Sequence, residues 1–126
     1  MNKAKVLVIF FILLVLACAH EPYGQGKRIY ETYCLNCHMA DGSGLGELYP
    51  QLENSAYLNG LQNKLACLIY KGAQSSKLST VAMPAHYQIE PAAMTNLINY
   101  LSYRWGNKSV ITLQEINNQL NQCPRK

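Results

Sequence analysis

The strongest constraint in this sequence is the run Cys34-Leu35-Asn36-Cys37-His38, in which two cysteines stand two residues apart and a histidine follows the second. On a helical turn, thiols at this spacing reach two reactive groups on one edge of a flat ring, and the next side chain points a ring nitrogen at the centre of that ring. The pattern is the attachment signature of haem c. We therefore expect one haem, bound covalently through Cys34 and Cys37, with His38 as an axial ligand of its iron.

Two other uses of a cysteine pair fit the sequence less well. A thioredoxin-like redox pair follows a strand in an α/β fold, and no alternating strand pattern of useful length appears in this chain. A zinc site needs a second pair of ligands at compact spacing, whereas Cys67 and Cys123 are far apart in the sequence. Haem attachment is therefore the preferred interpretation.

The first residues predict a secretion signal. Residues 1–5 form a short basic segment, and an uninterrupted apolar run follows from Val6 to Ala17. Such a run is too short to span a bilayer comfortably, and it matches the hydrophobic stretch of a signal peptide, which we place at residues 1–17. An uncleaved N-terminal membrane anchor is the alternative interpretation.

The end of the apolar run resembles the lipobox of bacterial lipoproteins, because Val15-Leu16-Ala17 precedes a cysteine, Cys18. The resemblance implies that Cys18 becomes the lipid-bearing first residue of the mature protein and that residues 18–23 form its linker. Acyl chains stabilise membrane attachment by about 0.8 kcal/mol per buried methylene. We therefore expect an exported protein, anchored on the periplasmic side of a bacterial membrane. The alternative is that Cys18 is discarded with the signal peptide.

The size and charge of the mature chain exclude some functions. Removal of residues 1–17 leaves 109 of the 126 residues, enough for one domain with a modest core, which we place at residues 24–126. The chain has 11 basic and 7 acidic residues, and because Lys3 and Lys5 leave with the signal peptide, the net charge falls from +4 to +2. A nearly neutral domain lacks the basic surface that nucleic-acid binding requires.

Hydrophobic periodicity predicts four helices and no strand, so we expect an all-α fold. The first helix holds the cysteine pair, and one of its faces contains Gly26, Ile29, Tyr30, Tyr33, Cys34 and Cys37. The others are expected at residues 57–71, 91–105 and 112–123. Gly72 is suited to end the second helix, Pro91 to begin the third, and Thr112 with Glu115 forms a capping box at the start of the fourth.

The second axial ligand of the iron is expected to be Met83. This methionine lies on a loop and precedes Pro84, which fixes the backbone and removes a competing amide group. A histidine–methionine pair raises the reduction potential relative to a pair of histidines. His86, three residues further along, is the alternative ligand.

Three other residues with suitable side chains are less well placed. Met39 adjoins His38 and does not reach the opposite face of the ring. Met94 belongs to the apolar stripe of the third helix, where a role in the core is more common. His20 is too close to the expected lipid anchor.

With the cysteine pair, His38 and Met83-Pro84 in place, the mature chain resembles class I cytochrome c over nearly its whole length. The resemblance implies the fold of that family, with helices packed around one haem. It implies that Gly26 and Tyr30 meet Tyr100-Leu101. It also implies that the Pro50 carbonyl accepts the ring N–H of His38, and that Tyr57 faces a haem propionate.

The end of the chain departs from the minimal family pattern, because a fourth helix follows Trp105 and carries Cys123. In this respect the chain resembles a subgroup of small bacterial cytochromes with a C-terminal extension. Cys67 and Cys123 are the two remaining thiols in an oxidising compartment, and a disulfide between them would stabilise the fold by roughly 4 kcal/mol. The alternative is two buried free thiols.

The resemblance implies an electron carrier, not an enzyme, because an iron with both axial positions filled has no place for a small-molecule substrate. Its partners would be other redox proteins, and Lys64, Lys71 and Lys77 are candidates for steering an acidic one, although they are equally well explained as ordinary surface lysines. Two alternatives are an electron-entry subunit of a larger membrane oxidoreductase and a gas-binding or sensing haem domain. A peroxidase or a gas-binding domain would require the sixth position to open, and no distal arginine motif is evident.

Overall fold

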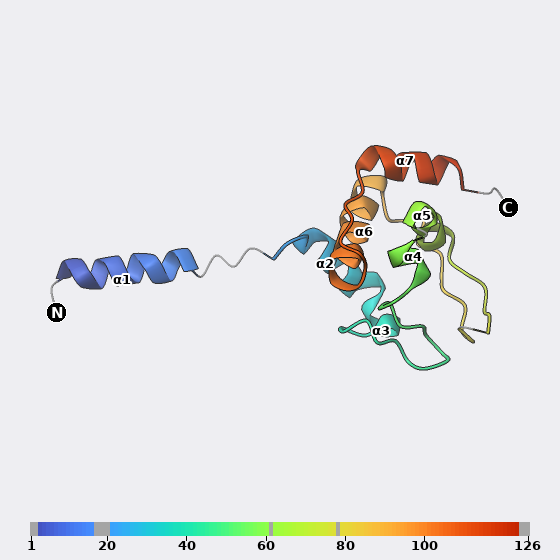
Figure 1. Cartoon of the computed structure of the whole chain (residues 1–126), viewed down its shortest axis with the longest axis horizontal. Helices are drawn as coiled ribbons and strands as arrows, with labels where there is room; N and C mark the ends of the chain where they lie inside the picture. Colours follow the sequence, from blue (N-terminus) through green and yellow to red (C-terminus); the bar gives the residue numbers. More distant parts are fainter. Residues whose placement is uncertain (1–2, 17–20, 61, 78, 124–126) are drawn as a thin grey trace.

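The computed structural model describes residues 3–16, 21–60, 62–77 and 79–123 of the chain. This described part contains seven helices and no strand, so the all-α prediction is confirmed (Figure 1). The helices are α1 (Lys3–Leu16), α2 (Gly24–Tyr33), α3 (Leu35–His38), α4 (Ala56–Asn59), α5 (Gln62–Lys71), α6 (Pro91–Trp105) and α7 (Leu113–Asn121).

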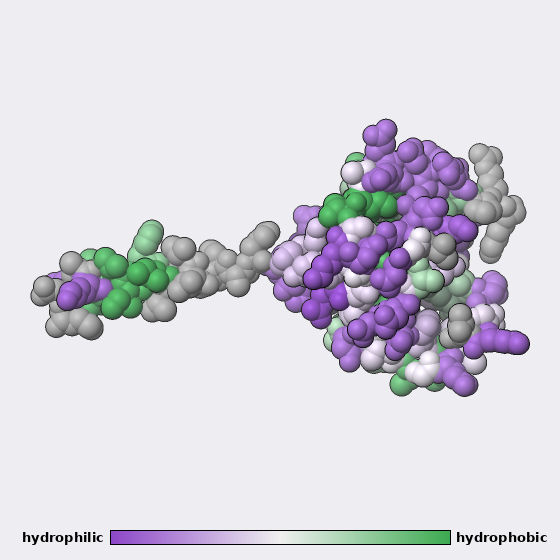
Figure 2. All heavy atoms as spheres, viewed as in Figure 1, coloured by the Kyte–Doolittle hydropathy of each residue, from purple (hydrophilic) through white to green (hydrophobic). Residues whose placement is uncertain are grey.

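The apolar run at the start of the chain forms α1. Residues 6–12 each keep 45 % or more of their surface exposed, and Figure 1 shows this helix apart from the others. Apolar residues colour much of α1 in Figure 2, whereas polar residues dominate the visible face of the domain. Within the described residues, no helix is both long and apolar enough to cross a membrane. The predicted lipidation site Cys18, and His20 beside it, lie outside the described residues.

The domain is built on the crossing of α2 and α6. Gly26 is buried there, and a Cβ atom at this position would collide with the carbonyl oxygen of Asn96 and lie 2.6 Å from the Cβ of Tyr100. The Tyr30 ring, one turn further along α2, has its centroid 5.8 Å from that of Tyr100. The expected contact of Gly26 and Tyr30 with Tyr100 is thus confirmed, and the α2 backbone lies directly against α6 at Gly26.

A single apolar core joins five of the helices. Its buried members come from α2, α4, α5, α6, α7 and the segment before α6; they are Tyr30, Leu58, Leu65, Ala66, Ile69, Ile89, Met94, Leu97, Ile98, Tyr100, Leu101 and Ile116. Met94 has no exposed surface, which agrees with its predicted role in the core.

The first two helices expected from the sequence are each interrupted, so the prediction of continuous helices is wrong in both cases. The helix with the cysteine pair divides at Cys34, where the backbone departs to φ −119° while the Cys34 N–H still donates to the Tyr30 carbonyl at 2.8 Å. The helix expected at residues 57–71 divides at Gly60, whose φ of −163° is not helical. Glycine costs about 1 kcal/mol in a helix interior, so it is a natural point for the break.

The helix ends agree with most of the sequence signals. Gly72 follows α5 with a left-handed φ of 71°, and Pro91 is the first residue of α6. At α7 the Thr112 hydroxyl accepts from the Glu115 N–H at 3.3 Å, and the Glu115 carboxylate accepts from the Thr112 N–H at 2.7 Å. The predicted capping box is confirmed. However, α7 ends at Asn121, so Cys123 follows the helix instead of lying along its face.

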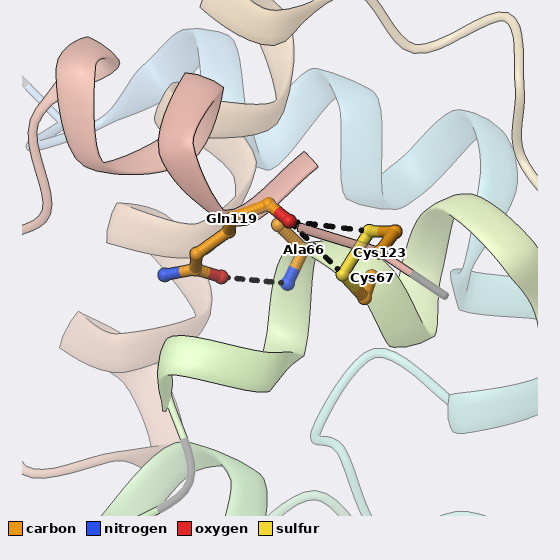
Figure 3. Close-up of a disulfide and its surroundings, with 4 residues drawn as sticks. All are labelled: Ala66, Cys67, Gln119 and Cys123. Atoms are coloured by element: carbon orange, nitrogen blue, oxygen red, sulfur yellow. Dashed lines mark hydrogen bonds between the residues drawn. A yellow bond between two sulfur atoms is a disulfide. The ribbon is translucent and has the colours of Figure 1, made fainter. Parts of the chain in front are cut away.

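Cys67 of α5 and Cys123 are joined in a disulfide, with their Cα atoms 5.5 Å apart (Figure 3). The two sulfurs lie 3.2 and 3.3 Å from the carbonyl oxygen of Gln119, and the Gln119 side-chain oxygen accepts from the Ala66 N–H at 3.3 Å. The extra C-terminal helix is therefore attached covalently to α5, and these two thiols are not available for a zinc site.

Replacing Gly26 with alanine is expected to lower the free energy of unfolding by about 3 kcal/mol, because the methyl group forces α2 away from the α6 backbone. Gly24→Ala is the matched control on the same helix, since a Cβ there meets only the Arg28 guanidinium at 4.0 Å. That variant should change stability by less than about 0.5 kcal/mol. Urea unfolding followed by circular dichroism measures both, and equal stabilities would contradict the close contact.

Candidate haem-binding site

Cys34 directly precedes the single turn of α3, and Cys37 lies within that turn. Both are free and half-buried. Burial, together with the neighbouring Cys37, raises the pKa of the Cys34 thiol to about 12. At neutral pH Cys34 is therefore a neutral thiol, with low intrinsic reactivity as a nucleophile or thiolate ligand. The backbone break at Cys34 sets the direction in which its side chain leaves the helix.

His38 ends α3 and is held in one orientation by the chain that follows it. Its Nδ1 atom lies 3.0 Å from the carbonyl oxygen of Pro50. Because a carbonyl oxygen only accepts, Nδ1 must carry the hydrogen, and Nε2 keeps a free lone pair. Burial lowers the pKa of His38, while the bond to Pro50 opposes that shift. The ring is thus neutral and presents Nε2 as a metal donor, which is the arrangement that the resemblance implies.

Two aromatic side chains, the buried Tyr30 and the half-buried Trp105, hold the segment just after His38. The Tyr30 hydroxyl donates to the Met39 carbonyl at 2.6 Å, and burial raises the pKa of Tyr30, so its proton is retained. The Trp105 indole N–H donates to the Asp41 carbonyl at 2.7 Å. The sequence analysis does not predict these two hydrogen bonds. The apolar stripes that contain Tyr30 and Trp105 are the signal for them, because the polar atom of a tyrosine or tryptophan on such a stripe needs a partner.

Gly44 forms a close contact that determines where the Pro50 carbonyl lies. Its φ is 65°, and a Cβ atom there would collide with the Tyr49 carbonyl oxygen and lie 2.8 Å from the Pro50 oxygen. The Gly44 N–H also donates to the His38 carbonyl at 3.2 Å. Only glycine combines this left-handed conformation with so small a separation, so the turn at Gly44 supports the His38–Pro50 bond.

Met83 lies on a loop that is attached to the C-terminal end of α5. Its N–H donates to the Ala73 carbonyl at 2.9 Å, and its carbonyl accepts from the Ala73 N–H at 3.0 Å. Three residues later the His86 N–H is shared between the carbonyls of Ile69 and Tyr70, both at 3.2 Å. The Met83 side chain is half-buried and packs against the core. Its backbone is therefore fixed by α5.

The loop that carries Pro50 and the loop that carries Met83 are hydrogen-bonded to each other. The Glu47 carbonyl accepts from the Thr80 N–H at 2.8 Å and from the Thr80 hydroxyl at 3.1 Å. The Ser79 hydroxyl donates to the Leu48 carbonyl at 3.0 Å. These bonds bring together two of the segments that the sequence analysis assigned to the site. No periodic pattern in the sequence predicts them.

The other predicted site residues have the following positions. His86 is buried, with its ring centroid 5.8 Å from that of Tyr33, and burial lowers its pKa. Tyr57 is half-buried against the core, and its role toward a propionate stays a prediction. Lys64 and Lys77 are exposed, and Lys71 is half-buried.

These residues fit a haem of the c type. Two adjacent thiols suit thioether formation, the Nε2 atom of His38 suits iron, and the Met83 thioether suits the same metal from a different segment. Apolar side chains from the neighbouring segments pack on the core but keep part of their surface uncovered, as expected where an apolar ring would cover them; they are Leu35, Leu52, Tyr57 and Leu68.

The described residues form a small helical domain with a Cys-x-x-Cys-His turn at its candidate site. The chain belongs to the cytochrome c family, whose sequence pattern matches residues 24–105. It is 30 % identical over 95 residues to the cytochrome c subunit of the quinone-type alcohol dehydrogenase of Gluconobacter oxydans. The match covers 68 % of this chain and 20 % of that subunit, so the chain spans about a fifth of its relative. Members of this family bind haem c covalently and transfer electrons.

Replacing Gly44 with alanine is expected to displace the Pro50 carbonyl and weaken its bond to His38. Gly46→Ala is the matched control, because Gly46 has a similar φ of 54° but no atom within 4 Å of an added Cβ. Relative to that control, Gly44→Ala should lose about 2 kcal/mol more stability. Its reduction potential should rise, because the imidazole becomes less basic.

Chemical denaturation and a redox titration followed by absorbance measure the two effects. If both variants have the same reduction potential, the turn at Gly44 does not support the histidine.

Proposed function

We propose that this protein carries single electrons in the cell envelope, using one haem c attached through Cys34 and Cys37 and ligated by His38 and Met83. The observation that carries the proposal is the neutral, oriented ring of His38, together with the hydrogen bonds that join its loop to the Met83 loop. Haem, when bound, supplies a one-electron couple.

Each residue of the site has a separate role. Cys34 and Cys37 retain the cofactor where lost haem cannot be recovered, and Pro50 holds His38 in its donor tautomer. Met83 is a neutral sulfur ligand, which favours the reduced state of the metal and raises the potential. With both axial donors in place, no position is open for a substrate, so electrons pass without bond formation.

The charge distribution supports a specific orientation of the partner. Residues 21–53 contain five acidic and two basic residues, whereas residues 54–89 contain three lysines and no acid. The segment that contains Met83 is thus basic, and the segment that contains His38 is acidic. The lysines of the Met83 segment would attract an acidic partner before contact, and the effect weakens as salt screens it.

A second candidate function is a role as the electron-entry subunit of a larger dehydrogenase. The similarity to a subunit of a quinone-type alcohol dehydrogenase favours it. Identification of the redox proteins that co-purify from membranes distinguishes a free carrier from such a subunit. A gas-binding domain, the third possibility from the sequence, requires Met83 to leave. Rapid and complete carbon monoxide binding at neutral pH would contradict the carrier.

Met83→Leu is expected to abolish the far-red sulfur-to-iron charge-transfer band of the oxidised protein. It should also lower the reduction potential by roughly 0.2 V, within the range of about 0.8 V that axial ligands span. Met94→Leu is the matched control, because Met94 is fully buried in the core and the exchange conserves volume. Absorbance spectra and redox titrations test both variants, and a band that survives in Met83→Leu would exclude Met83 as the ligand.

We also propose that residues 1–17 are removed as a signal peptide and that Cys18 carries the lipid of a membrane anchor. The mature protein should therefore have the mass of residues 18–126 plus one haem and the acyl groups on Cys18. Cys18→Ser should lose the acyl mass and leave the membrane fraction in high salt. Intact-mass spectrometry measures the mass of the mature protein. An unmodified Cys18 or a different first residue would refute the proposal.

A further inference from the structure

The Met83 loop connects α5 and α6, two helices that share the apolar core. The loop leaves α5 at Lys71 and enters α6 at Pro91. Both helices pack more extensively against α7 than against each other, and Figure 1 shows α7 at the top of the domain, above both. The spacing of the two stems of the loop therefore depends on α7.

On the α6 side, α7 is fastened by a pair of hydrogen bonds and a buried side chain. The Asn99 side chain donates to the Ile111 carbonyl at 3.0 Å and accepts from the Ile111 N–H at 2.8 Å. Asn99 is 8 % exposed, so these bonds are shielded from water. Ile116, in the middle of α7, has no exposed surface. This end of α7 is firmly attached without any covalent link.

On the α5 side, the covalent attachment is the disulfide. Cys123 follows the last turn of α7 and is bonded to Cys67; Figure 3 also shows the contact of the Cys67 sulfur with the Gln119 carbonyl oxygen, at 3.2 Å, and the bond from the Ala66 N–H to the Gln119 side chain, at 3.3 Å. Both cysteines keep part of their surface exposed, so a small reductant has access to them.

Cys67 lies one turn before the α5 carbonyls that hold the Met83 loop. Ile69 and Tyr70 accept from His86, and Ala73 pairs with Met83. The whole Met83 loop and α6 also lie inside the ring of chain that the disulfide closes, which spans a sequence separation of 56 residues. Opening that ring removes a constraint on both stems of the loop.

We propose that α7 acts as a splint that holds α5 and α6 at the spacing required for Met83 to ligate iron, and that the Cys67–Cys123 disulfide is a redox-sensitive lock on this splint. A dithiol would reduce the bond by exchange: two electrons and two protons pass to the two protein sulfurs, and the dithiol becomes a disulfide. The end of α7 is then released, and Met83 leaves the metal in a larger fraction of molecules. The inference rests on the ligation by Met83 proposed above.

The test compares the holoprotein with intact and with reduced disulfide. Ascorbate reduces the haem and leaves the disulfide, whereas tris(2-carboxyethyl)phosphine reduces both, so carbon monoxide binding to the ferrous protein can be measured in each state. We expect binding about tenfold faster after disulfide reduction, within the usual range of coupling between sites. Cys67→Ser/Cys123→Ser should show the same rate under ascorbate, and a weaker far-red band when oxidised.

A matched pair on α6 separates this coupling from general loss of stability. Asn99→Ala cuts the hydrogen bonds to Ile111, in the segment that leads into α7, and should also speed carbon monoxide binding. Asn96→Ala, one turn earlier, removes a hydrogen bond to Gln25 of α2 at 2.8 Å and should leave the rate unchanged.

The outcomes distinguish the two proposals. A wild-type spectrum without the far-red band would refute Met83 ligation itself. A normal band in the wild type, with unchanged carbon monoxide binding after disulfide reduction, would overturn the splint alone. Equal acceleration in Asn96→Ala and Asn99→Ala would overturn it as well, and so would a mass spectrum of the oxidised protein with two free thiols at Cys67 and Cys123.

Discussion

The contact between α2 and α6 at Gly26 is the constraint on which the site depends. Because α2 lies directly on the backbone of α6, Tyr30 and Trp105 meet with ring centroids 5.0 Å apart, and each donates a hydrogen bond to the segment that follows His38. The loop after α3 thus takes its position from the helix crossing. Apolar packing of the two rings stabilises the helix crossing, and the polar atoms of the same side chains fix the position of the loop after α3.

The sequence predicted those features that depend on local chemistry. The Cys-x-x-Cys-His turn and the capping box at Thr112 are short patterns with direct physical causes, and the start of α6 at Pro91 follows from the same logic. The break at Gly60 has a local signal as well, because a glycine there interrupts the apolar stripe of residues 57–71. The break at Cys34 was not visible, because no residue there disfavours a helix.

The contacts between loops were beyond sequence reasoning for a different reason. The bonds between Glu47 and Thr80, and between Ala73 and Met83, use mainly backbone groups. Every residue has those groups, so no side-chain pattern marks which of them will pair. Conversely, the pairing of Cys67 with Cys123 required only a count of the remaining thiols. The sequence therefore indicates which side chains are candidate donors, and it carries no pattern for the backbone framework that holds their segments.

The bonds between the Pro50 loop and the Met83 loop have a consequence for the speed of the reaction. An electron moves quickly when the donor site changes little in shape between its two oxidation states, because the barrier contains the energy of that rearrangement. With Glu47 bonded to Thr80, a shift of one loop strains the other, so the two loops resist independent movement. Donors held in advance in this way need little reorganisation at the moment of transfer. The stiffness of two surface loops is thus a kinetic property of the protein as well as a structural one.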